Sequence, residues 1–60
     1  MLIDEIDNRL NNMLENINDV EIKDINKISN EIDNLLNKNN VKLSDYLKLL
    51  DKSILIMELV

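Results

Sequence analysis

Apolar residues recur three and four positions apart along most of this chain, and this spacing constrains its fold more than any other feature. Residues that far apart share one face of an α-helix, whereas a half-buried strand would alternate apolar and polar residues. Three segments of the 60 residues show the pattern, at about 2–17, 20–38 and 45–59. Because so short a chain buries only about 60% of its unfolded surface, the sequence predicts one all-α domain, residues 1–60, built as a small helical bundle.

The apolar positions form a stripe on each segment. The first stripe is Ile3, Ile6, Leu10, Met13 and Ile17, widened by Leu14. The second is Ile22, Ile25, Ile28, Ile32, Leu35 and Leu36. The third is Leu43, Leu47, Leu50, Ile54 and Met57. Each amphipathic helix is expected to turn its stripe toward the core.

Polar residues mark where the helices should begin and end. Asn18 or Asp19 can cap the second helix, and Asn18 with Glu21 resembles a capping box. This leaves a short connection after the first helix, so the first two helices are expected to form an antiparallel hairpin over residues 1–40. Asn39 or Asn40 fits a helix C-cap, and Ser44 is the expected N-cap of an additional C-terminal helix within residues 41–60.

The end of the third segment is apolar nearly all round, since Glu58 is the one polar residue in 54–60. A surface helix requires only one apolar face. Either both sides are buried within the bundle, or the surplus contacts another chain. In so small a domain we favour the second alternative and predict a homodimer or a partner complex, with Ile54, Met57 and Leu59 at the interface.

The composition excludes several classes of function. The chain has no Cys and no His, which rules out zinc fingers, thiol catalysis and Ser-His-Asp triads. Its net charge of −5 disfavours nucleic acid and anionic membranes. No apolar run approaches the roughly 20 residues of a membrane span, and residues 1–7 lack the basic start of a secretory signal. We expect a cytoplasmic protein. We also expect no metal site, because a helix splays the acids at Asp4, Glu5 and Asp7 around its axis.

A polar row follows one edge of the second helix. On a helical wheel Asn26, Ser29, Asp33 and Asn37 fall together beside the apolar face. Such a row of amides, a hydroxyl and a carboxylate can dock a partner and perform chemistry. The alternative is that these are ordinary solvated boundary positions, and spacing alone favours that alternative.

The segment Ser29-x-x-Ile32-Asp33-x-x-Leu36 resembles the S-x-x-[L/I]-D-x-[L/I]-[L/I] signature of the stage-zero sporulation E-like family. These are very small aspartyl-phosphate phosphatases of spore-forming Firmicutes. Ile3-Asp4-Glu5-Ile6 and residues 10–16 resemble the opening and first-helix core of the family, and residues 28–37 follow its second helix. The resemblance covers about residues 3–40.

The resemblance implies a function and a set of site residues. The protein would dephosphorylate a response regulator and so restrain the initiation of sporulation through two-component signalling. Asp33 would accept a hydrogen bond from the attacking water, and Ser29 would orient that water or pack at the interface. Asn26, Asn37, Ile32 and Leu36 would contact the regulator. The hydrolase would need no cofactor of its own, because the phosphorylated partner supplies the divalent metal.

The chain also departs from the family. Asp7 stands where the family usually has a basic residue, a place that Arg9 can take, and Asn39-Asn40 stand where a Tyr often follows the second helix. Residues 41–60 extend beyond the two-helix core. The competing interpretation is a non-enzymatic helical module, either an oligomerisation domain or a small phage or host inhibitor that binds through its apolar tail.

Overall fold

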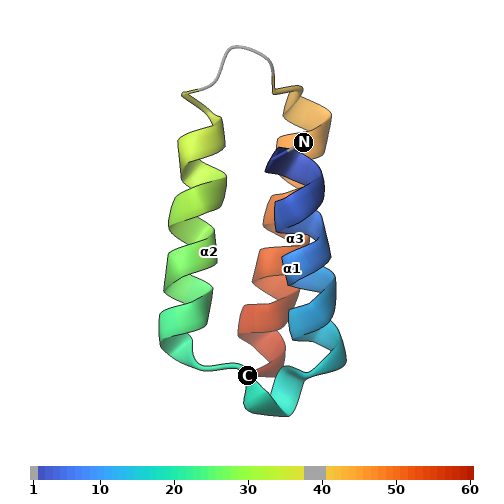
Figure 1. The fold of residues 1–60 in the computed structure, drawn as a ribbon, viewed down its shortest axis with the longest axis vertical. Helices are drawn as coiled ribbons and strands as arrows, with labels where there is room; N and C mark the ends of the chain where they lie inside the picture. Colours follow the sequence, from blue (N-terminus) through green and yellow to red (C-terminus); the bar gives the residue numbers. More distant parts are fainter. Residues whose placement is uncertain (1, 38–40) are drawn as a thin grey trace.

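A computed structural model describes residues 2–37 and 41–60. It contains α1 (Leu2–Glu15), a short 3₁₀ turn η1 (Ile17–Asp19), α2 (Ile22–Leu35) and α3 (Leu43–Leu59). Figure 1 shows α2 running antiparallel to α1, with α3 parallel to α1 and packed along both. The described residues contain no strand. The predicted all-α class and the antiparallel hairpin are therefore confirmed.

The connection between α1 and α2 differs in detail from the prediction. Residues Ile17–Asp19 form the 3₁₀ turn η1, and Glu21, in an extended conformation, is the N-cap of α2. The Glu21 amide donates a hydrogen bond to Asp24 Oδ2 at 3.1 Å. The predicted N-caps Asn18 and Asp19 are thus wrong, because both residues belong to the 3₁₀ turn and α2 begins later, at Ile22.

The start of α3 differs from the prediction in the opposite direction, because this helix begins earlier than expected. Lys42 is the N-cap in an extended conformation and the helix begins at Leu43, so Ser44 lies inside its first turn. The predicted C-caps Asn39 and Asn40 lie outside the described residues.

The core is a single cluster of aliphatic side chains from all three helices. Its buried members are Ile6, Leu10, Ile25, Ile28, Ile32, Leu35, Leu49 and Ile56. The stripes of α1 and α2 supply most of these residues, as predicted, although Ile22 and Leu36 at the two ends of the α2 stripe are exposed. The contribution of α3 differs from the prediction.

The predicted stripe of α3 is not the buried one. Leu43, Leu47, Ile54 and Met57 are between 42% and 67% exposed, whereas Leu49, Ser53 and Ile56 are at most 2% exposed. The buried residues also follow a four-three spacing, shifted by one position. Because α3 is apolar on both stripes, periodicity alone does not select between them, and the helix is rotated by about 100° from the predicted orientation.

Candidate functional site

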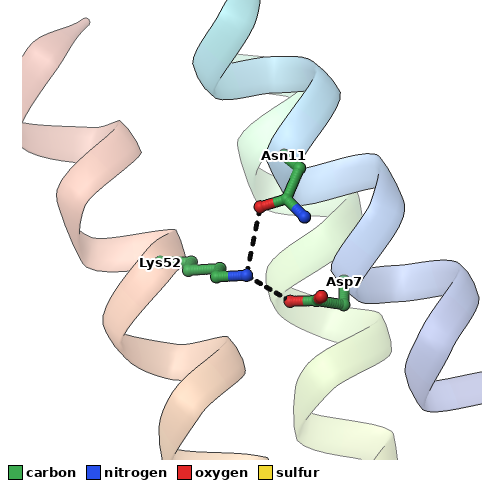
Figure 2. A network of polar contacts seen from close by, with 3 residues as sticks. All are labelled: Asp7, Asn11 and Lys52. Carbon is green, nitrogen blue, oxygen red and sulfur yellow. Dashed lines mark hydrogen bonds and ion pairs between the residues drawn. The ribbon is translucent and has the colours of Figure 1, made fainter.

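The groove between α1 and α3 is closed by a polar cluster. Lys52 Nζ of α3 donates hydrogen bonds to Asp7 Oδ1 at 2.5 Å and Asn11 Oδ1 at 3.0 Å (Figure 2). Asp7 is the residue that departs from the family pattern, and its charge is met here by a lysine from the additional helix. This contact fixes which side of α3 faces α1.

The groove between α1 and α2 carries an ion pair. Arg9 Nη1 lies 2.6 Å from Glu31 Oε2. Beside it is a shallow hollow of about 250 Å³, lined by Arg9, Asn12, Met13, Asp24 and Lys27. The hollow lies on the side of α2 away from Asp33, so it is no part of the predicted edge.

The groove between α2 and α3 holds two hydroxyls and no ion pair among the described residues. Ser29 Oγ of α2 lies 3.4 Å from Ser53 Oγ of α3, and either atom can be the donor. Ser53 is 2% exposed and Ser29 is partly buried. The serine of the predicted motif is therefore packed against the additional helix.

These contacts place the exposed apolar side chains of α3. Lys52 precedes Ser53 by one residue and faces α1, so Ile54, one residue after Ser53, projects about 100° the other way. The residues in register with Ile54 continue its stripe along the α2 side of the helix. They are Leu43, Leu47, Leu50 and Met57.

The side chain of Asp33 projects from α2 on the side away from α1. Glu31 precedes Ile32 by one residue and pairs with Arg9 of α1. Asp33 follows the buried Ile32 and therefore projects away from α1, toward the outer side of the α2–α3 groove. Both helices thus contribute exposed side chains to one surface.

We call this surface the α2–α3 face. Its members are Ile22, Asn26, Ser29 and Asp33 of α2, Leu36 at the C-cap of α2, and Leu43, Leu47, Leu50, Ile54 and Met57 of α3. Ile22 and Leu36 are 70% and 58% exposed, and Asp33 is exposed among them. Asp33 is the one charged member of the face. Apolar patches of this kind, rimmed by polar residues, are typical of protein-binding sites.

The structure places the predicted site residues in three settings. Asn26 and Asp33 are exposed along α2, Leu36 and Asn37 are exposed in the turn just after it, and Ser29 of α2 is partly buried. Ile32, predicted to contact a partner, is 1% exposed and belongs to the core of this chain. Ile54 and Met57 lie on the α2–α3 face, whereas Leu59, 56% exposed, lies on the α1 side of α3.

Sequence reasoning missed Ser53 and the exposed ends of the α2 stripe. Ser53 lies four residues after Leu49 and three before Ile56, a spacing that would have indicated a second stripe. Ile22 and Leu36 gave no such signal, since their positions fit the α2 stripe. They are exposed because the neighbouring helices do not cover the two ends of that stripe.

Within residues 2–37 and 41–60, no group of three or more acidic side chains is arranged to hold a metal ion. None of the described helices is long and apolar enough to cross a membrane. Comparison with protein-family models, with curated proteins and with solved structures finds no match for this chain. The likeness of residues 3–40 to the sporulation phosphatases therefore stays a prediction from the sequence.

Proposed function

We propose that this protein is an aspartyl-phosphate phosphatase that acts on a phosphorylated response regulator, with Asp33 as its catalytic residue. One observation carries the proposal: Asp33 is an exposed carboxylate on a face whose other exposed members are mostly apolar. A receiver domain that covers the α2–α3 face would enclose Asp33 at the interface. In this proposal the protein acts in the cytoplasm and restrains the initiation of sporulation, as the family that it resembles does.

Hydrolysis of an aspartyl phosphate requires few catalytic groups from the phosphatase. A phosphorylated aspartate is a reactive acyl phosphate, and its own protein supplies the divalent metal. The phosphatase has only to hold one water in line with the phosphorus atom. Asp33 accepts a hydrogen bond from that water, whose oxygen attacks phosphorus as the bond to the aspartyl oxygen breaks. The products are inorganic phosphate and the free carboxylate of the regulator.

Ser29 has a positioning role in this proposal. Its hydroxyl is within 3.4 Å of Ser53 Oγ, so it holds α2 against α3 one turn before Asp33. We assign it to packing at the edge of the site, which is the second of the two roles that the resemblance allows.

A second candidate function rests on the apolar members of the same face. Their exposure is sufficient for a non-enzymatic interaction module, which would bind a partner through Leu47, Ile54 and Met57 without hydrolysing anything. The two candidates differ in whether they need Asp33. The enzyme requires its carboxylate, and the binding module does not.

The test separates docking from hydrolysis. Binding to a phosphorylated receiver domain of a sporulation response regulator is measured for the wild type, Asp33→Asn and Ile54→Asp. We expect Asp33→Asn to keep the receiver bound and to leave its phosphate intact. Ile54→Asp should lose binding and activity together, because a charge then lies in the apolar docking surface.

Asp51→Asn is the matched control, since Asp51 is an exposed aspartate of α3 outside the α2–α3 face. It should hydrolyse the phosphate as the wild type does. Binding by the wild type, Asp33→Asn and Asp51→Asn without any loss of phosphate would refute the enzyme and support the interaction module. Circular dichroism of each variant shows that the helices are retained.

A further inference from the structure

We propose that the α2–α3 face also binds a second copy of this chain, with the two α3 helices packed antiparallel and Leu50 beside the two-fold axis. The apolar side chains that would form this contact are exposed in the single chain, namely Leu43, Leu47, Ile54 and Met57. In a symmetric dimer the same surface serves both subunits, so it must be complementary to itself.

The α3 stripe meets this requirement by its spacing. Leu43 and Met57 each lie seven residues from Leu50, and Leu47 and Ile54 lie three and four residues from it. When two such helices pack antiparallel about Leu50, Leu43 comes level with Met57 of the second copy, and Leu47 comes to within one residue of the level of Ile54, about 1.5 Å along the axis. The run of four-three spacings is the seam that two packed helices share.

The helix dipoles favour the antiparallel direction. In a parallel pair the two α3 dipoles point the same way, whereas in an antiparallel pair the positive N-terminus of each helix lies beside the negative C-terminus of the other. Lys48 and Asp51 are exposed but lie outside this contact, because at about 100° per residue they project about 160° and 100° away from Leu50.

One side of the three-sided bundle has the area that a stable interface requires. Such an interface buries about 800 Å² on each partner, which is less than a fifth of the 4420 Å² surface of one chain. The α2–α3 face is one of the three sides of the bundle, and its α3 stripe extends over ~21 Å at about 1.5 Å per residue.

Dimer formation would regulate the site, a consequence that rests on the proposed function. Ser29 is level with Ser53 and α2 is antiparallel to α3, so Asp33 is level with Leu49, beside the two-fold axis. A second copy on this face therefore covers Asp33. Self-association and docking of the receiver domain compete for the same surface, and the dimer is the inactive form.

The absence of cysteine from the chain allows a direct test of the register. A disulfide requires Cα atoms roughly 4.4–6.8 Å apart, so a single introduced cysteine reports on its own neighbour across the interface. Leu50→Cys should form a covalent dimer on mild oxidation. Leu47→Cys and Ile54→Cys should not do so alone, but their mixture should give the mixed dimer. Leu55→Cys, on α3 outside the face, is the matched control and should form no covalent dimer.

Sedimentation equilibrium of the wild type supplies the second measurement. We expect a reversible dimer that Ile54→Asp converts to a monomer, because the substitution places a charge in the apolar interface. Ile54 is 42% exposed, so the substitution spares the core. A monomeric wild type at all concentrations would overturn the proposal. Self-cross-linking of Leu47→Cys and Ile54→Cys, each alone, would overturn the antiparallel register.

The regulatory consequence is tested separately from the dimer. The oxidised Leu50→Cys dimer should have no phosphatase activity, and a reducing agent should restore it. Full activity of the oxidised dimer would overturn the competition. If the wild type has no phosphatase activity at all, the proposed function fails, while the cross-linking and sedimentation results still decide the dimer.

Discussion

At the scale of single residues, Ser53 decides how closely α2 and α3 approach. It occupies a core position between Leu49 and Ile56 and is 2% exposed. A buried hydroxyl needs a hydrogen-bond partner, and Ser29 Oγ provides one across the groove. The small side chain fits where a leucine would separate the helices. The serine of the predicted motif thus has a structural role in this chain.

Two substitutions of Ser53 test this role. Ser53→Ala removes the hydrogen bond but fits the space, and should lower the free energy of unfolding by about 1 kcal/mol. Ser53→Leu overfills the groove and should cost more, about 1–3 kcal/mol. Urea unfolding followed by circular dichroism measures both. A Ser53→Leu variant as stable as the wild type would show that α2 and α3 are not in close contact at this position.

At the scale of elements, the sequence determines α1 and α2 better than α3. The first two helices each have one apolar stripe opposite polar residues, so periodicity predicts which side is buried. On α3 two stripes run side by side, and Leu49 and Leu50 are equally apolar. The choice depends on contacts between segments far apart in sequence, such as Lys52 with Asp7, which helical periodicity does not contain. The predicted caps of α2 were wrong for a local reason, because the 3₁₀ turn η1 includes Asn18 and Asp19 and α2 begins only at Ile22.

A matched pair of substitutions tests which stripe of α3 is in the core. Leu49 is 1% exposed and Leu47 is 47% exposed. Leu49→Ala should cost about 2–5 kcal/mol, enough to unfold much of so small a domain. Leu47→Ala should cost under about 1 kcal/mol when measured at low protein concentration, where association contributes least. Equal losses, or a larger loss for Leu47→Ala, would contradict the orientation of α3.

At the scale of the whole molecule, the bundle measures 35 × 17 × 17 Å, so any function of this protein depends on residues at its surface. Ion pairs close two of the grooves, and the third side carries the exposed apolar residues around Asp33. In the two proposals above, this surface docks a receiver domain or a second copy, but not both together. The single charge on that surface then has opposite effects, because Asp33 serves hydrolysis and opposes self-association.

Asp33→Asn should consequently strengthen self-association. Burying an ionised carboxylate at the dimer interface is costly, and the amide avoids much of that cost. We expect the dimer dissociation constant to fall about three- to tenfold, which corresponds to roughly 1 kcal/mol, as measured by sedimentation equilibrium. Asp51→Asn, which removes a charge outside the face, should leave the dimer dissociation constant unchanged. A weaker dimer in Asp33→Asn would show that Asp33 is not covered.

The most direct test of the central claim is the lifetime of the aspartyl phosphate on a sporulation response regulator. The rate constant of phosphate loss is measured with no added protein, with the wild type and with Asp33→Asn, at a concentration where both the wild type and the variant are monomeric. We predict that the wild type shortens the lifetime and that Asp33→Asn lowers the catalysed rate by about 10²–10⁴. An unchanged lifetime with the wild type, or equal rates for the wild type and Asp33→Asn, would contradict the assignment of Asp33 as the catalytic residue.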